Sequence, residues 1–417
     1  MGVKNALQNN KREVKDVFYL IALQGLNYIV PLLVLPYLMV VLGAEKFGYI
    51  GFSLSVAQYL MLFVDFGFNL SATKRIALAK DNQEQLNKIF SATVYAKMGL
   101  LLFSFLLLLL VSVVPQFAVY RATMLVMFLT VVGQAGLFVF LFQGIGQIKW
   151  VSIFNGIAKI SVLPLTFWLV QSPDDYLWAA FLQGMVAVVA AGISLVMIYR
   201  KRWVRLIKVA FEDIKLELSE SFPLFLSTAA TSIYTACFVL ILGYFALPEQ
   251  VGQYSAVDRI MRALCYMLVV PVLQVFYPYV AGLAQQNRQE ALQKIKYLFG
   301  FVIGAMLLLG GFLFFASPLM IYFLGDDYQG TDILFKIMAF VPIFVGMGGV
   351  IGQLKLLAMG DESDKKYFSK TYVVAACVAI SSVLVLSYLF GMYGTAVSLL
   401  LTEITVFVLF LLRAKTK

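Results

Sequence analysis

The chain has 417 residues, of which 62% are hydrophobic and only 13% are charged. Soluble globular proteins carry about a quarter charged residues, so the composition excludes that class and indicates a polytopic membrane protein. The net charge is +10 and there is no histidine. This excludes histidine metal sites and histidine catalysts, and the positive charge fits cytoplasmic loops better than a nucleic-acid surface.

The first apolar run, 17–42, follows a basic tail that contains Lys4, Lys11, Arg12 and Lys15. It is longer than a signal-peptide core and has no small-residue cleavage site. We therefore expect a retained first span and a cytoplasmic N-terminus.

Twelve apolar runs each approach the length of one bilayer crossing. They cover residues 17–42, 48–70, 90–113, 121–142, 150–171, 176–199, 222–246, 254–281, 297–323, 331–357, 370–390 and 393–413. Because the runs are continuous rather than alternating, they predict helices, and the fold class is an all-α membrane protein of twelve transmembrane helices. An even number of spans places both termini on the same side.

The distribution of charge between the loops gives the orientation. The predicted cytoplasmic segments hold 24 of the 32 Lys and Arg residues, whereas the outer loops hold only Lys46 and Arg121. Seven acidic residues lie in the outer loops: Glu45, Asp174, Asp175, Glu249, Asp326, Asp327 and Asp332. This asymmetry predicts that both termini are cytoplasmic. All the outer loops are short, and none is long enough to form an extracytoplasmic domain.

The longest inner loop, 200–221, divides the chain into two halves. Its apolar residues alternate with charges at near-helical spacing, which indicates an interfacial amphipathic helix. Ser221 and Pro223 suit the N-cap and first turn of the seventh span. The predicted organisation is therefore an N-terminal six-helix lobe at 1–205, a cytoplasmic amphipathic linker at 206–221 and a C-terminal six-helix lobe at 222–417.

A short repeat supports a relation between the halves. Residues 45–49 read EKFGY and residues 249–253 read EQVGQ, each after an odd-numbered span. Transporters are commonly built from such repeats, with a substrate site between them near the midplane. Pro31 and Pro36 in the first span are candidate hinges, because proline kinks a helix and frees backbone carbonyls. Ordinary tolerance of proline in membrane helices is the alternative.

Charged residues inside the spans are the main functional signal, because each costs at least about 2.5–3.5 kcal/mol at bilayer depth. Six are basic: Lys97, Lys159, Arg259, Arg262, Lys336 and Lys355. Three are acidic: Asp65, Asp258 and Glu403. Lys355 lies near a cytoplasmic end, where its side chain can reach the interface. Lys336 lies near the outer end and is open to the same interpretation.

Without Lys355 the bases exceed the acids, and a cavity of that sign would attract an anion such as a diphosphate. The candidate anion-binding residues are Arg259, Arg262, Lys159, Lys97 and Lys336. Two alternatives remain open: Asp258 pairs with Arg262 four residues later, and Lys97 and Lys159 pair with Asp65 or Glu403 across helices. The three cysteines, Cys237, Cys265 and Cys377, are far apart and are expected to pack as apolar residues.

The stretch VDFGFNLSATKRIA at 64–77 resembles a signature of the polysaccharide flippases, the Wzx-type O-antigen transporters. GAEKFGYIGFSLSV before it, LFQGIGQIKW at 141–150 and SFPLFLS at 221–227 resemble the same family, and the resemblance extends along nearly the whole chain. The family belongs to the multidrug/oligosaccharidyl-lipid/polysaccharide superfamily. The resemblance implies two six-helix lobes around a central cavity that opens alternately to either side.

The resemblance also implies the substrate and the location. A flippase of this kind carries undecaprenyl-diphosphate-linked oligosaccharide from the cytoplasmic to the periplasmic leaflet of the bacterial inner membrane. Proton or sodium antiport is the implied energy source, and the polysaccharide polymerase machinery is an implied partner. No cofactor, metal or enzymatic activity is expected. Coupling candidates are Asp65, Glu403 and Asp258, although Asp65 is also placed to cap or pair near Lys74 and Arg75.

Three rivals remain. A cation-coupled multidrug exporter of the same superfamily is the first, and it would need an acidic cavity to bind cationic drugs. A flippase for peptidoglycan or teichoic-type precursors is a second possibility, and relatives of that kind often have more spans. A glycan polymerase or ligase is disfavoured by the short outer loops. Tyr28, Tyr234, Tyr254 and Tyr266 are candidates for stacking on sugar rings.

Overall fold

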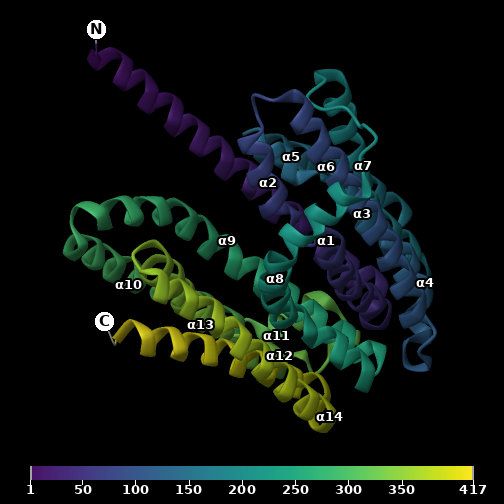
Figure 1. The fold of residues 1–417 in the computed structure, drawn as a ribbon. Helices are drawn as coiled ribbons and strands as arrows, with labels where there is room; N and C mark the ends of the chain where they lie inside the picture. Colours follow the sequence, from purple (N-terminus) through teal and green to yellow (C-terminus); the bar gives the residue numbers. More distant parts are fainter. Residues whose placement is uncertain (1, 416–417) are drawn as a thin grey trace.

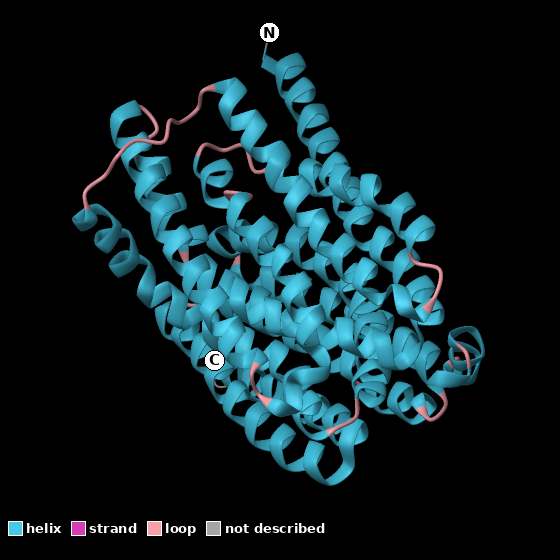
Figure 2. Cartoon of the chain, turned by 90° about the vertical axis from the view of Figure 1, so that its right-hand side faces the viewer, coloured by secondary structure: helices cyan, strands magenta, loops and turns pink. Residues whose placement is uncertain are grey.

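The computed structural model describes the backbone of residues 2–415. It describes the side chains of residues 33–415, apart from residues 227, 230, 231 and 233. Pro31 and Tyr28 therefore lie outside the described side chains. Throughout the described part the regular structure is helical, with no strand (Figure 2).

The N-terminal half comprises seven α-helices and two short 3-10 helices. In chain order they are α1 (Gly2–Asp65), α2 (Phe68–Leu78), α3 (Gln83–Ser112), η1 (Pro115–Tyr120), α4 (Arg121–Gly136), α5 (Val139–Gly144), α6 (Lys149–Leu169), η2 (Pro173–Asp175) and α7 (Tyr176–Lys201).

The C-terminal half is built in the same manner. Its elements are α8 (Phe211–Phe245), α9 (Pro248–Gln286), α10 (Arg288–Phe315), α11 (Ser317–Leu324), η3 (Asp326–Tyr328), α12 (Thr331–Met338), α13 (Val341–Gly349), the π-helix η4 (Val350–Ala358) and α14 (Glu362–Lys415). Figure 1 shows α3–α7 grouped on one side of the molecule and α9–α14 on the other, with α8 between them.

Two of the helices each contain two of the predicted spans. α1 has a left-handed residue at Gly43 (φ 67°), and Leu35 and Leu54, on either side of it, line the same cavity. α14 has one at Gly391 (φ 56°), where Ser387 hydrogen-bonds to Thr395. In the described part of the chain, nine helices are long and apolar enough to cross a membrane, which confirms a polytopic all-α protein. The exact number of twelve spans stays a prediction.

Two further breaks occur in the N-terminal half, one between α1 and α2 and one between α4 and α5. Phe66 (φ 43°) and Gly67 (φ 81°) separate α1 from α2, and Phe138 (φ 49°) separates α4 from α5. The Thr73 hydroxyl donates to Phe140 O at 3.2 Å, which ties α2 to α5. The stretch 64–77 is therefore a helix break: a left-handed pair of residues turns the chain into a short second helix.

The two halves meet at the end of the molecule that carries the acidic loops, which we call the acidic end (Glu45, Asp174, Asp175, Glu249, Asp326, Asp327 and Asp332). The Tyr328 hydroxyl donates to Met39 O at 3.3 Å, and the Arg259 guanidinium carbon lies 5.2 Å from the Phe47 ring centroid. α1 and α9 pack closely there through Gly48 and Gly252. The small residues allow the two backbones to touch.

At the opposite end, the basic end, the predicted linker 206–221 is irregular up to residue 210 and helical from Phe211 onward. Residues 203–210 have no regular secondary structure, and α8 begins at Phe211 and continues past Ser221 and Pro223 without a new start. The prediction of a helix start at Ser221 is wrong. Side chains of α3 hold the irregular segment instead: Asn87 Oδ1 accepts from Arg205 N at 2.8 Å, and Ser91 Oγ accepts from Ile207 N at 2.9 Å. These tertiary hydrogen bonds replace the ones a helix would supply.

Candidate functional site

A polar cavity of about 490 Å³ lies where α1, from the N-terminal half, faces α8 and α9. Its lining residues are Gln58, Tyr59, Met61, Ser232, Thr235, Ala236, Arg262 and Tyr266. Both halves contribute to it, as expected for a transporter site between repeats. Arg262 is the charged residue of this lining.

Arg262 is held in place by residues of its own helix. Its Nε donates to Asp258 Oδ1 at 2.7 Å, and its Nη1 donates to the Tyr266 hydroxyl at 3.2 Å. The i,i+4 spacing on α9 places these groups above one another, which confirms the expected pairing of Asp258 with Arg262. Within the described part of the chain Nη2 makes no hydrogen bond, so one edge of the guanidinium remains for a ligand in the cavity.

Glu403 lies behind Arg262, away from the cavity lining. It is 5% exposed, accepts a hydrogen bond from the Tyr234 hydroxyl at 3.2 Å and interacts electrostatically with Arg262. α8, α9 and α14 thus share one buried polar network. Tyr234 is only 9% exposed and serves this network, and Tyr254 is fully buried. Tyr266 lines the cavity, and so does Tyr59, which the sequence analysis did not single out.

The structure brings Asp65 and Lys97 together. Lys97 on α3 is 4% exposed, interacts electrostatically with Asp65 and lies 5.6 Å from the Phe140 ring centroid. Asn69 hydrogen-bonds to Asp65 from the first turns of α2. Lys97 is therefore a partner of Asp65 rather than a lining residue of the central cavity, as the cross-helix alternative described.

The other predicted basic residues lie apart from the central cavity. Arg259 is one residue from Asp258 but faces the acidic-end junction, where its guanidinium carbon lies 5.2 Å from the Phe47 ring centroid. Lys336 on α12 pairs with Asp332 at 3.3 Å in an exposed i,i+4 ion pair. Lys355 donates to Ala414 O at 2.6 Å. The excess of positive charge expected for one cavity is therefore distributed over several places.

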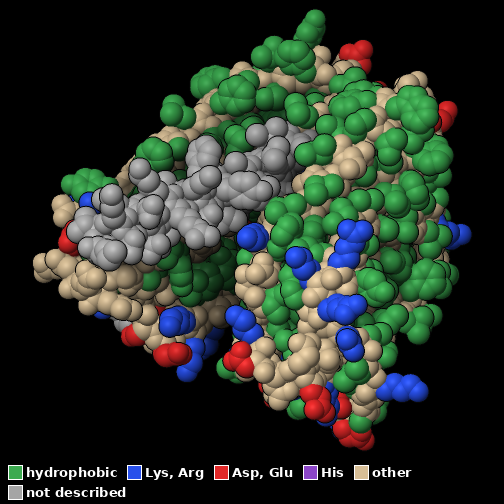
Figure 3. All heavy atoms as spheres, turned by 90° about the horizontal axis from the view of Figure 1, so that it is seen from above, with side chains coloured by type: hydrophobic (Ala, Val, Ile, Leu, Met, Phe, Trp, Pro, Cys, Tyr) green, Lys and Arg blue, Asp and Glu red, His purple; other side chains and the backbone are tan. Residues whose placement is uncertain are grey.

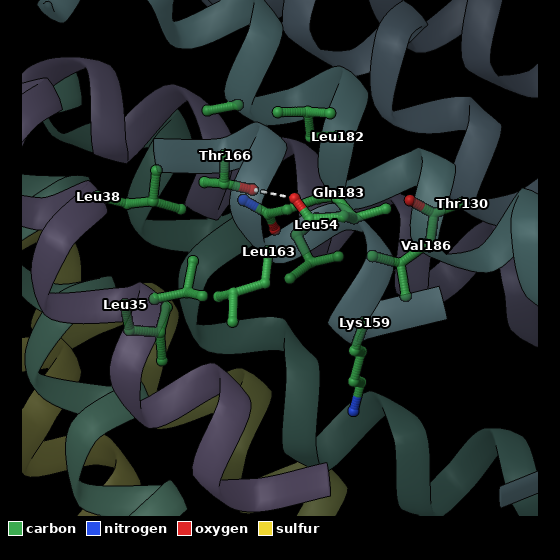
Figure 4. Close-up of a pocket in the computed structure, with 13 residues that line it drawn as sticks. Leu35, Leu38, Leu54, Thr130, Lys159, Leu163, Thr166, Leu182, Gln183 and Val186 are labelled. Atoms are coloured by element: carbon green, nitrogen blue, oxygen red, sulfur yellow. Dashed lines mark hydrogen bonds between the residues drawn. The ribbon is translucent and has the colours of Figure 1, made fainter. Parts of the chain in front are cut away.

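Lys159 lines a second, smaller cavity of about 230 Å³ in the N-terminal half, between α1, α4, α6 and α7. Figure 4 shows Thr166 close to Gln183 and Thr130 further along beside Val186, while the Lys159 side chain points away from them at the edge of the cavity. Among the described lining residues, the others are apolar. Thr130, Thr166 and Gln183 were not predicted, because each is a single polar residue in a strongly apolar helix.

Pro36 is exposed on α1, and the helix remains regular there, with its non-helical residue at Gly43. Hinging at Pro36 stays a prediction. Of the cysteines, Cys237 and Cys265 are buried and Cys377 is exposed. In the described residues no group of His, Cys, Asp and Glu side chains could hold a metal ion.

A polar pocket of about 360 Å³ opens at the basic end between α2, α3 and the start of α8. Arg75 Nη1 lies 2.6 Å from Glu217 Oε1, and Lys88 Nζ lies 2.9 Å from Asp213 Oδ1. Burial raises the pKa of Glu217 to about 7, although Arg75 beside it acts in the opposite direction. Arg75 thus pairs with Glu217 and not with Asp65, contrary to one interpretation of Asp65.

Comparison with known proteins places the chain in a family. The model of a family described as "Polysaccharide biosynthesis protein" matches residues 14–284, more than half of the chain. A curated protein of Escherichia coli (strain K12), named "Putative O-antigen transporter", is 31% identical over 405 residues, which are 95% of each chain. A protein of Shigella dysenteriae with the same name is 31% identical over 96% of this chain and 99% of its own.

Solved structures give the fold. The lipid II flippase MurJ in an inward closed conformation matches with a TM-score of 0.73 at 15% identity, over 95% of this chain and 87% of its own. An inward-facing multidrug transporter of the MATE family matches with a TM-score of 0.68 at 12% identity, over 93% of this chain and 98% of its own. The family model and the 31% identical relatives show that this multi-pass membrane protein belongs to the polysaccharide biosynthesis protein family.

Proposed function

We propose that this protein is a flippase that moves a lipid-linked oligosaccharide, carried on undecaprenyl diphosphate, from the cytoplasmic to the periplasmic leaflet of the bacterial inner membrane. The observation that carries the proposal is the cavity between the halves, which presents Arg262 beside two tyrosines. The named function of the curated relatives supports the same class of substrate.

Arg262 is suited to the anionic part of such a substrate. A guanidinium offers several donors in a planar fork that matches phosphate oxygens. Asp258 fixes the Nε edge, which orients the remaining donors before a ligand arrives. The pairing also reduces the cost of keeping the arginine inside the membrane when the cavity is empty.

Tyr59 and Tyr266 are suited to the sugar part. Each combines an apolar ring face with a hydroxyl, and they line the cavity from α1 and α9, one from each half. A sugar between them would contact both halves, so a change in their separation would alter its binding. Gln58, Ser232 and Thr235 add hydrogen-bonding groups to the same wall.

Alternating access requires one end to be closed while the other admits the substrate. Here the halves are in backbone contact at the acidic end through Gly48 and Gly252. If this end is periplasmic, as predicted, the glycine contact closes the periplasmic side in the present form. Proton or sodium antiport is the proposed energy source, with Glu403, Asp258 and Asp65 as candidate carriers because each is an acid within the predicted membrane region.

A cation-coupled multidrug exporter is the second candidate, because the MATE-family fold is shared. The charged residue in the lining of the central cavity is an arginine, and its acidic partner is already engaged. A lipophilic cation would gain little there. The cavity therefore favours the anionic lipid over the cationic drug.

The test is translocation in proteoliposomes that contain undecaprenyl-diphosphate-linked oligosaccharide, with and without an imposed proton or sodium gradient. An added glycosidase reports which sugars are accessible from outside. We expect gradient-dependent movement with the unaltered chain and its loss in Arg262→Gln. Efflux of a cationic dye without any movement of the sugar lipid would overturn the proposal.

Lys336→Gln is the matched control. It also removes a base from an i,i+4 ion pair, but one that is exposed and lies outside the central cavity. Its transport should match that of the unaltered chain. Equal loss in both variants would mean that Arg262 has no special role in binding the substrate.

A further inference from the structure

Three arginines at the basic end line a groove that the proposed transport does not use. Arg200 lies in the last turn of α7, Arg202 is the residue that follows this helix, and Arg205 lies in the irregular segment 203–210. All three are exposed, and none forms an ion pair with a described residue. Their charge is therefore available to an external partner.

The floor of this groove is apolar and large. It encloses about 710 Å³ between α3, α7 and the irregular segment, over Phe90, Val94, Phe138, Ile198 and Val204. That volume is within the range of ligand pockets. No residue of this lining belongs to the central cavity or to the cavity beside Lys159.

The side walls carry apolar side chains that face outward. Leu195 is 49% exposed, Leu206 is 56% exposed and Tyr199 is 84% exposed. On a membrane protein such residues contact lipid, and a tyrosine next to basic residues is typical of the membrane interface. The face seen in Figure 3 carries many Lys and Arg side chains next to hydrophobic surface over its right-hand part.

Hydrogen bonds from α3 fix one wall of the groove. Gln83, Asn87 and Ser91 occur every four residues along α3 and bond to the backbone of the segment at Trp203, Arg205 and Ile207. This row of hydrogen bonds holds the segment against α3. These bonds keep Arg205 at the rim of the groove, whereas an untethered loop would allow Arg205 to move away from the rim.

We propose that this groove, which we call the arginine groove, binds an anionic phospholipid of the membrane leaflet at the basic end. An acyl chain would lie on the apolar floor, and the three arginines would hold the phosphate. Guanidinium groups suit phosphate oxygens, and basic pockets at the ends of membrane helices are known to select acidic lipid headgroups. A phospholipid fits better than the proposed substrate because the groove is separate from the cavity that both halves share.

Arg202 adds an independent indication. It adopts a left-handed conformation (φ 51°) at the residue that follows α7, a position where glycine is the usual choice. An arginine there carries a conformational cost and supplies a charge to the rim. Arg202→Gly should therefore raise the melting temperature while it weakens lipid binding, two changes of opposite sign that general unfolding would not produce.

The experiment is native mass spectrometry of the full-length protein in a neutral detergent, titrated with phosphatidylglycerol and, as the neutral reference, phosphatidylcholine. We expect tighter binding of the first phosphatidylglycerol. The triple variant Arg200→Gln, Arg202→Gln, Arg205→Gln should lose about a hundredfold of that affinity, since each basic residue near the surface contributes about a factor of five. Farnesyl diphosphate should not displace the bound phosphatidylglycerol.

The matched control is Lys365→Gln, Lys366→Gln, Lys370→Gln, which removes three exposed charges from α14 in the other half. It should bind phosphatidylglycerol as the unaltered chain does. An equal loss of phosphatidylglycerol affinity in both triple variants would show that only the net charge of the protein matters, and this would overturn the proposal. Displacement by farnesyl diphosphate would assign the groove to a prenyl lipid, and displacement by inorganic phosphate would assign it to the free anion; either result would also overturn it.

Discussion

Gly48 and Gly252 face each other across the junction of the two halves, 204 residues apart in the chain. A Cβ atom built on either glycine would lie 2.9 Å from the backbone nitrogen of the other. Each occupies the same place in the short repeat, EKFGY in one half and EQVGQ in the other. The repeat is therefore a pair of matching surfaces, and glycine is required in both because the helices touch backbone to backbone.

We predict that Gly252→Ala separates α1 from α9 at the acidic end. The new methyl group would lie 1.7 Å from Ala44 O, so the helices must move apart. Overpacking of this kind costs about 1–3 kcal/mol. The melting temperature in detergent should fall, and a cysteine placed at Ser255, which is 2% exposed, should become reactive towards a membrane-impermeant maleimide.

Gly99→Ala is the control for this substitution, because nothing lies within 4 Å of the position where its Cβ would be placed. Alanine is the better helix former, by about 1 kcal/mol, so this variant should be as stable as the unaltered chain or more stable. A Gly252→Ala protein that melts at the unaltered temperature would contradict the close contact.

Glu217 gives a prediction about pH. Burial raises its pKa from 4.5 to about 7 in the folded protein. An acid with a raised pKa binds its proton more tightly in the folded state. Its contribution to stability is therefore fully present below about pH 4.5, is lost as the pH rises through 7, and then changes no further. The whole loss is on the order of 3 kcal/mol.

The measurement is the melting temperature between pH 5 and pH 8 for the unaltered chain and for Glu217→Gln. The variant should show a flatter profile over this interval, because the titrating group is gone. Glu212→Gln, an exposed position on the same helix, should keep the original profile. Parallel profiles for Glu217→Gln and the unaltered chain would show that another group titrates.

Local patterns in the sequence predicted some parts of the site and fold. The pairing of Asp258 with Arg262 follows from their i,i+4 spacing, and the helical character of the chain follows from its apolar runs. The irregular segment 203–210 could not be predicted, because its conformation depends on hydrogen bonds from α3, more than a hundred residues earlier. Hydrophobic spacing alone favoured a helix there.

The sequence also could not show how the buried charges are distributed, because this depends on contacts between residues that are far apart in the chain. The sum over the predicted spans treats every buried base as part of one cavity. In the structure Lys97 is next to Asp65, and Lys336 is next to Asp332 at the acidic end. Tyr59 was missed because a tyrosine in an apolar helix has no feature that separates a cavity-facing ring from a lipid-facing one.

Variants of Arg262 and Asp258 allow effects on stability to be separated from effects on transport. Removal of one member of a buried ion pair leaves the other charge without compensation and costs about 3–5 kcal/mol. Arg262→Gln and Asp258→Asn should each lower the melting temperature, whereas the double variant should recover most of it. Transport should stay absent in the double variant, since the donor to the substrate is still missing.

The corresponding exposed pair, Asp332 and Lys336, provides the comparison. Its side chains are 34% and 42% exposed, and exposed pairs contribute at most about 1 kcal/mol. The single and double variants of this pair should melt close to the unaltered temperature and transport normally. Transport by the Asp258→Asn, Arg262→Gln protein would remove Arg262 from the proposed binding site.

Variants of Asp65 and Lys97 test whether this pair stabilises the fold or takes part in ion coupling. If the pair is structural, Asp65→Asn with Lys97→Met should fold and should keep gradient-driven transport, because both charges are removed together. Lys97→Met alone should be strongly destabilised, since it leaves Asp65 with Asn69 as its neutral partner. If Asp65 instead carries the coupled proton or sodium, the double variant should fold and bind substrate but no longer respond to the gradient. The proteoliposome assay with and without a gradient separates these outcomes, and the burial of Lys97 at 4% exposure leads us to expect the first.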